Sequence, residues 1–127
     1  MNMSTPTRVV ISEHKKTLSI EYKTGEGFTL SAEYLRVYSP SAEVRGHGEG
    51  QETLQFGKRD VAIASIEQSG NYAIQIIFDD GHDSGIYSWD YLRKLAIEKD
   101  QLWSEYLEKI HSSGVSREAN SQVIKLL

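Results

Sequence analysis

Two neighbouring stretches in the middle of the chain alternate between core-type and polar residues with a period of two. The alternating positions are Val61, Ile63 and Ser65, and then Tyr72, Ile74, Ile76 and Phe78. This period is typical of strands with one buried face, and Ser69-Gly70-Asn71 between the stretches predicts an antiparallel hairpin. Residues 79–83 predict a further turn into a short strand over residues 85–87. The chain is therefore expected to build an antiparallel sheet.

The amino-terminal part predicts a second set of strands. Leu18, Ile20 and Tyr22 alternate, and the polar residues 13–16 form the turn from a strand that begins near Arg8. A short strand then leads to Ser31, which is an N-cap residue for a helix near residues 32–37. Small antiparallel sheets combined with helices define an α+β fold.

A carboxy-terminal helix is expected from about residue 89. Ser88 can cap it, and Asp90 places a negative charge at the positive end of the helix dipole. Lys99 and Asp100 interrupt the apolar spacing and predict a break. The organisation that we expect is a flexible arm (1–7), one domain (8–98), a helical extension (99–112) and a mobile tail (113–127).

Length, charge and the lack of cysteine limit the classes of function that are expected for the chain. The 127 residues suit one domain, and a net charge of -4 argues against nucleic acid or anionic lipid as a partner. The chain has no cysteine, so any metal must be held by nitrogen or oxygen, and no cofactor is expected. No apolar run reaches the roughly 20 residues of a spanning helix, which predicts a cytoplasmic protein without membrane contact.

Three groups of residues suggest chemistry. His47-Gly48-Glu49 with the distant His82 matches the ligand types of non-haem iron sites, although such short matches arise by chance in Gly-rich loops. Asp80, His82 and Asp83, with His47, could bind a divalent cation, but charged turns commonly bind none. Ser39 and Ser41 resemble nucleophiles beside a proline, yet they lack a Gly-x-Ser-x-Gly elbow and are equally typical of a turn.

Aromatic and apolar residues suggest binding surfaces. The aromatic set could line a ligand pocket or form a tyrosine-rich core: Tyr34, Tyr38, Tyr72, Tyr87, Trp89 and Tyr91. An apolar stripe follows the last strand: Trp103, Tyr106, Leu107 and Ile110. This stripe either folds back on the sheet or meets another chain, and we take it as the candidate partner surface.

Two segments carry a family resemblance. Leu35-Arg36 leads to Ser39-Pro40-Ser41, and residues 78–92 read FDDGHDSGIYSWDYL. This pattern, spanning about residues 10–96, resembles the gamma-butyrobetaine hydroxylase-like N-terminal domain, also known as the DUF971 family. In the eukaryotic hydroxylases, the similar domain looks like a zinc module with three cysteines and a histidine, and a catalytic barrel follows it. We expect that barrel to be absent from this chain.

The resemblance places the three cysteine positions on Ser39, Ser41 and Val44, and the histidine on His82. Two hydroxyls and a valine cannot replace three thiolates, so this zinc site is expected to be degenerate. The domain is also attached to iron–sulfur carrier ATPases. We therefore expect a noncatalytic, cytoplasmic protein-interaction module, accessory to metal or iron–sulfur metabolism and able to self-associate. The alternative is a metal or small-ligand binding domain that uses His82 and neighbouring carboxylates.

Overall fold

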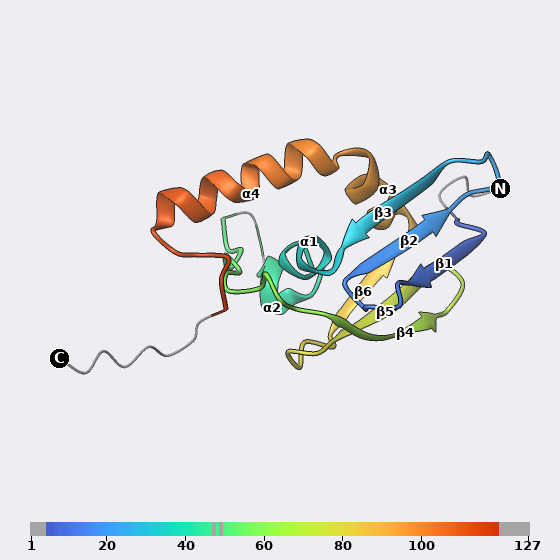
Figure 1. Ribbon diagram of the computed structural model, residues 1–127, viewed down its shortest axis with the longest axis horizontal. Coiled ribbons are helices and arrows are strands. Elements are labelled where there is room, and N and C mark those ends of the chain that lie inside the picture. Colours follow the sequence, from blue (N-terminus) through green and yellow to red (C-terminus); the bar gives the residue numbers. More distant parts are fainter. Residues whose placement is uncertain (1–4, 47, 49, 120–127) are drawn as a thin grey trace.

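The computed structural model describes residues 5–46, 48 and 50–119. Within them the strands form two three-stranded antiparallel sheets, with the orders β1-β2-β3 and β4-β5-β6. Helices follow each sheet along the chain and complete the α+β fold that the sequence predicts (Figure 1). The elements are β1 (Arg8–Ile11), β2 (Thr17–Glu21), β3 (Gly27–Ser31), α1 (Ala32–Val37), α2 (Ala42–Arg45), β4 (Ile63–Ser69), β5 (Ala73–Phe78), β6 (Gly85–Ser88), α3 (Trp89–Ile97) and α4 (Lys99–Ser113).

The two sheets share one apolar core. Alternate residues of β2 and β5 point into it, and α1 and α3 add buried side chains from the helical side. The largest fully buried side chains of the described residues are Tyr34, Tyr87, Phe78, Leu18, Ile20, Leu30, Leu35, Ile63, Ile76, Leu92, Leu95 and Val44, and all of them except Val44 belong to this core. Burial of these side chains removes apolar surface from water and supplies the main driving force for folding.

The helices begin where the sequence predicts. The Ser31 hydroxyl accepts the Tyr34 backbone N–H at 3.0 Å, and the Ser88 hydroxyl accepts that of Tyr91 at 3.0 Å. The predicted break near Lys99 and Asp100 lies at Glu98, which separates α3 from α4. The short helix α2 was not predicted.

One expectation about the chain surface is wrong. Tyr72 continues the alternation of β5, but it lies just before the first residue of that strand, Ala73, and is 68% exposed. Residues 115–118, which belong to the predicted mobile tail (113–127), return to the body of the chain after Gly114 ends α4. Gly57 donates its N–H to the Ser116 carbonyl at 2.8 Å, and Arg59 donates its N–H to the Arg117 carbonyl at 2.9 Å. Residues 120–127 lie outside the described residues.

Candidate functional site

The Ser-Pro-Ser corner joins α1 to α2. Ser39 is fully buried at this corner. The Ser41 hydroxyl accepts the Glu43 N–H at 3.2 Å and so caps α2. Pro40 has no N–H and fixes the backbone between the two serines. The corner is therefore a turn and a helix cap, which fits the prediction of Ser39 and Ser41 as turn residues rather than as nucleophiles.

Ser39 and His82 come together although 43 residues separate them. The Ser39 Oγ lies 2.8 Å from the His82 Nε2, and a Glu43 carboxylate oxygen lies 3.3 Å from the other ring nitrogen, Nδ1. Hydroxyl, imidazole and carboxylate thus follow one another in the order of a serine–histidine–acid triad. The His82 ring is buried and packs beside Phe78, with 6.1 Å between ring centroids.

This arrangement is not accessible to a substrate. A nucleophilic hydroxyl needs an open position for the reacting carbon about 3 Å away. The Ser39 Oγ is instead enclosed: it accepts the Ser41 N–H at 3.2 Å, and a Cβ built on Gly85 would lie 2.8 Å from it. Gly85 leaves room for Ser39 because it has no side chain. The triad order therefore serves packing, and Glu43 and Gly85 are site residues that sequence reasoning missed.

The other positions aligned with zinc ligands are also satisfied within the chain. The Ser41 and Ser84 hydroxyls lie 2.7 Å apart, and Ser84 follows two residues after His82. Val44 is 1% exposed and belongs to the buried apolar set. Neutral hydroxyls and an isopropyl group do not fit a zinc ion, which requires thiolate, imidazole or carboxylate ligands.

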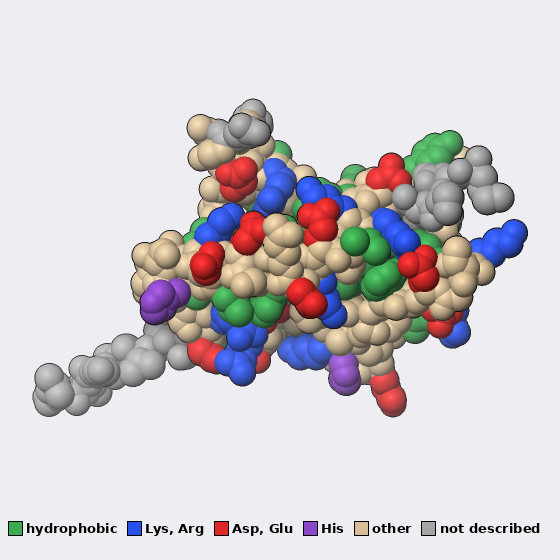
Figure 2. All heavy atoms as spheres, turned by 90° about the horizontal axis from the view of Figure 1, so that it is seen from above, with side chains coloured by type: hydrophobic (Ala, Val, Ile, Leu, Met, Phe, Trp, Pro, Cys, Tyr) green, Lys and Arg blue, Asp and Glu red, His purple; other side chains and the backbone are tan. Residues whose placement is uncertain are grey.

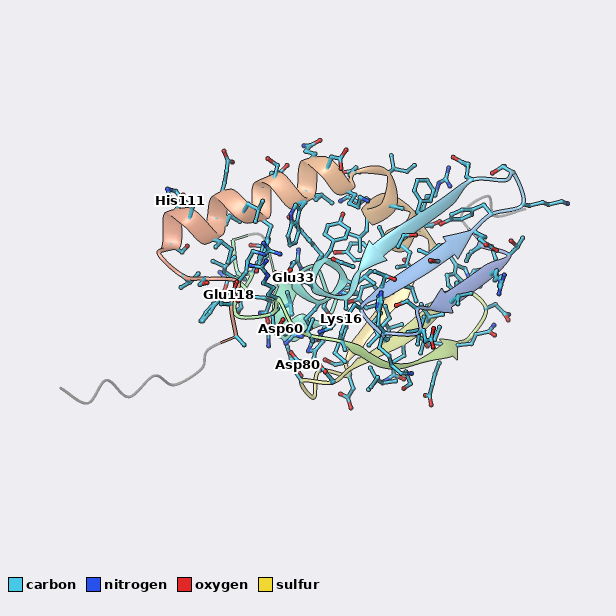
Figure 3. The ribbon with its side chains drawn as sticks, in the orientation of Figure 1. Lys16, Glu33, Asp60, Asp80, His111 and Glu118 are labelled. Carbon is cyan, nitrogen blue, oxygen red and sulfur yellow. The ribbon has the colours of Figure 1, made fainter. Side chains whose placement is uncertain are left out.

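The acidic turn commits Asp80 to ion pairs within the chain. The Asp80 carboxylate accepts hydrogen bonds from Arg36 Nε at 2.9 Å and from Lys58 Nζ at 2.7 Å (Figure 3 labels Asp80). Asp83 is exposed, and its backbone carbonyl accepts the Gln75 side-chain amide at 2.7 Å. Over residues 5–46, 48 and 50–119, no three histidine or acidic side chains are placed to hold a metal. The candidate His47 lies outside the described residues.

The burial of His82 opposes its protonation. Burial lowers the pKa of His82 below its usual 6.5, and the positive charge of Arg36 lowers it further, against the smaller opposing effects of Glu43 and Asp80. Burial raises the pKa of Asp80, but hydrogen bonds from Lys58 and the His82 N–H, with the charge of Arg36, outweigh it and lower the pKa to about 2. At neutral pH the folded chain therefore holds His82 as neutral imidazole and Asp80 as carboxylate.

We expect the free energy of unfolding to fall as the pH drops below 6.5, the usual pKa of an exposed histidine. Below that pH the unfolded chain binds a proton that folded His82 resists, so the loss continues down to the lowered pKa of His82. Asp80 acts in a separate window, between its usual 3.8 and about 2. Urea unfolding from about pH 7.5 to 4.5 measures the slope. His82→Gln should reduce this slope of the unfolding free energy against pH, whereas His111→Gln, at an exposed position of α4, should leave it unchanged. Equal slopes in the natural chain and in both variants would contradict the prediction.

The helical stripe proposed as a partner surface is largely used inside the chain. Tyr106 and Ile110 are buried against Val37 of α1. Trp103 packs edge-on against Tyr34, with 6.2 Å between ring centroids. Of the four residues only Leu107 is exposed, at 38%. Figure 2 looks onto the side where α4 lies, and acidic and basic side chains alternate there among scattered apolar ones. The stripe is therefore a packing surface, because α1 and residues 115–118 cover it.

Residues 115–118 contribute a charged pair that was not predicted from the sequence. Arg117 donates to both carboxylate oxygens of Glu33, at 2.8 and 2.7 Å. The Glu33 side chain, on α1, is 7% exposed (Figure 3). The Arg117 guanidinium carbon also lies 5.0 Å from the Trp103 ring centroid, within cation–π distance. This pair holds residues 115–118 against α1 and α4.

Of the aromatic set, Tyr34, Tyr87 and Trp89 lie in the core and Tyr38 and Tyr91 pack against it, whereas Tyr72 is exposed. The Tyr34 hydroxyl donates to the Leu95 carbonyl at 2.7 Å, the Tyr38 hydroxyl to that of Leu102 at 2.6 Å, and the Trp89 indole N–H to that of Asn71 at 2.9 Å. The Tyr91 hydroxyl donates to the Tyr38 carbonyl at 2.6 Å, and Tyr87 donates to the Leu35 carbonyl. These rings, with their polar atoms paired at the edge of the core, therefore fit the tyrosine-rich core that was the alternative to a ligand pocket.

Comparison with known proteins identifies the family. The model of the family described as "Gamma-butyrobetaine hydroxylase-like, N-terminal" matches residues 9–93, and the chain belongs to this family. Among curated proteins no match is found. Within the described part of the chain, no helix has the length and apolar character needed to span a membrane.

Solved structures extend the similarity beyond the matched segment. Two NMR solution structures are 46% and 42% identical, with TM-scores of 0.81 and 0.76. The first covers 99% of both chains, and the second covers 97% of this chain and 95% of its own. A crystal structure from Acidithiobacillus ferrooxidans, of a DUF971 family protein with unknown function, is 29% identical with a TM-score of 0.61, covering 74% of this chain and 94% of that one.

Proposed function

We propose that this chain is a noncatalytic module that acts by binding another protein. The observation that carries the proposal is the enclosure of its reactive groups: Ser39 and His82 contact each other in the interior, and Glu43, whose side chain is 71% exposed, reaches only the His82 ring. The hydroxyl, imidazole and carboxylate that chemistry would need are committed to holding the corner between α1 and α2. Function then depends on the surface of the module.

The outer face of the second sheet is the surface that we assign to the partner. On β6, Gly85 and Tyr87 face the core, while Ile86 between them is 52% exposed. Ile86 lies opposite Gln75 of β5, which places the half-buried Ile77 at the diagonal position on the same face. β6 is also an edge strand, so its outer backbone groups can pair with an added strand.

The family resemblance directs the choice of partner. Because similar domains are attached to iron–sulfur carrier ATPases, we propose a cytoplasmic partner from metal or iron–sulfur metabolism. The alternative function, metal binding through His82, has less support. The Asp80 carboxylate is already paired with two cations, and both ring nitrogens of His82 lie beside side-chain oxygens.

Affinity capture with matched surface variants tests the proposed function. The tagged natural chain, Ile86→Lys and Ile97→Lys are each used to capture proteins from native lysate, with quantification by mass spectrometry. Ile97 is 58% exposed on α3 and controls for the added charge. We expect a specific protein with the natural chain and Ile97→Lys, depleted at least about tenfold with Ile86→Lys because a lysine at an apolar contact is desolvated without a partner.

Size measurement by light scattering reports self-association in the same three chains. A dimer that Ile86→Lys dissociates would make the partner a second copy. A strictly monomeric chain that captures nothing above background would remove the proposal, as would equal recovery by both variants.

A further inference from the structure

A cavity of about 270 Å³ lies between the end of α1, the loop after α2 and α4. Its apolar wall includes Val37 and Leu54, and its aromatic wall is formed by Tyr38 and Tyr106. Arg45, Glu52 and Lys109 bring charge to it. The cavity is separate from the corner at Ser39 and His82, and the proposed partner surface on β6 does not use it.

Arg45 is held in this cavity without a complete set of acceptors. Its guanidinium carbon lies 5.6 Å from the centroid of the Tyr38 ring, and Nη2 reaches the Val37 carbonyl only at 3.4 Å. Its Nε is buried and, within the described part of the chain, has no hydrogen-bond partner. A buried N–H without an acceptor is costly, so the hydrogen-bonding capacity of Arg45 is not fully met by the described part of the chain.

Arg45 and Lys109 are the cations of the cavity wall, and the two tyrosine hydroxyls of the wall are already used as donors within the chain. The Tyr38 hydroxyl donates to the Leu102 carbonyl, and the Tyr106 hydroxyl donates to that of Gln55 at 2.8 Å. Burial raises the pKa of each tyrosine to about 12, so both stay neutral. With Glu52 as the single acid of the wall, the charged lining residues carry an excess of one positive charge.

The wall of the cavity is held in place by contacts within the chain. Gly46 ends α2 with φ of 72°, and a Cβ there would collide with the Gln51 backbone. Thr53 donates its N–H to the Val44 carbonyl at 2.8 Å, which fixes the loop against α2. A preformed wall reduces the entropy that binding must overcome.

We propose that this cavity binds a small organic carboxylate, with its carboxylate at Arg45 and Lys109 and its apolar body against Tyr38, Tyr106 and Leu54. The guanidinium is a planar fork that matches a carboxylate. The volume accepts a ligand the size of a single aromatic ring, and the apolar walls favour one over a fully hydrated inorganic anion.

Titration with benzoate tests the proposal, and benzamide serves as its uncharged counterpart of the same shape. Backbone amide NMR shifts are followed for the natural chain, Arg45→Gln, Lys109→Gln and Arg8→Gln. Arg8 lies on β1 with an exposed side chain and controls for the loss of one positive charge. We expect benzoate to bind with a Kd in about the millimolar range and to shift residues 37–38, 45, 53–55 and 106.

Arg45→Gln should weaken benzoate at least about tenfold and Lys109→Gln by a smaller factor, whereas Arg8→Gln should leave the Kd unchanged. Glu52→Gln should tighten binding, because it removes the opposing charge. The Lys109 variant alters only an exposed helix position, so it keeps the test valid if Arg45→Gln fails to fold. Equal binding of benzamide, shifts elsewhere, or an unchanged Kd in Lys109→Gln would overturn the proposal.

Discussion

The triple variant Ser39→Cys, Ser41→Cys and Val44→Cys is expected to bind zinc tightly, whereas the natural chain should not. Three thiolates and an imidazole make a closed tetrahedral zinc site. His82 is prepared for this role, since Nε2 faces Ser39 at 2.8 Å and Nδ1 faces the Glu43 carboxylate at 3.3 Å. A carboxylate on the second ring nitrogen is the usual way in which a zinc-binding histidine is oriented.

Cobalt(II) absorption and zinc content by mass spectrometry measure this result. Tetrahedral thiolate coordination gives cobalt an intense visible spectrum, which zinc should displace. Adding His82→Ala to the triple variant should strongly weaken metal binding. The thermal midpoint of unfolding should rise with zinc only when all four ligands are present, because binding to the folded state adds to its stability. A triple variant that folds but gives the same cobalt spectrum with and without His82 would refute the placement of these four residues.

Replacing Arg117 by methionine should lower the free energy of unfolding by about 3 kcal/mol, because it leaves the Glu33 carboxylate buried without its partner. The Glu33 side chain is 7% exposed and that of Arg117 is 30% exposed, so we take the lower end of the range for a broken buried pair. Methionine keeps apolar contact with Trp103 and thus isolates the loss of charge and hydrogen bonds.

Urea unfolding of three further variants makes this measurement specific: Arg59→Met, Glu33→Gln, and the combination of Glu33→Gln with Arg117→Met. Arg59→Met removes the exposed pair with Glu118 and should cost within about 1 kcal/mol. Combining Glu33→Gln with Arg117→Met should cost less than the sum of the single changes, since the second change no longer strands a charge. If Arg117→Met unfolds like Arg59→Met, residues 115–118 do not depend on this pair.

The strands and helix starts were predictable because their causes are local. Alternation at residues 74–78 and the turn at residues 69–71 reappear as β5 and its hairpin with β4. Ser31 and Ser88 act as caps through hydrogen bonds that span three residues. Tyr72 shows the limit of this reasoning, because alternation assigns a face but does not say where the sheet ends.

The site was only partly predictable. The resemblance pointed to Ser39 and His82, and the structure brings them into contact. It gave no signal for Gly85, whose role depends on the distance to Ser39, or for Glu43, which reaches His82 from another element. The surface role of Trp103, Tyr106 and Ile110 failed for a similar reason, since an apolar stripe does not indicate what covers it.

The sequence by itself determined the α+β class, the hairpins, the helix caps and the lack of thiolates, because each follows from neighbouring residues or from composition. Only the tertiary structure decided that the Ser-Pro-Ser corner is closed around His82 and that Arg117 reaches Glu33, 84 positions earlier in the chain. Such contacts depend on how the sheets and helices pack, and packing is the sum of many weak contacts with no signature in a short stretch of sequence.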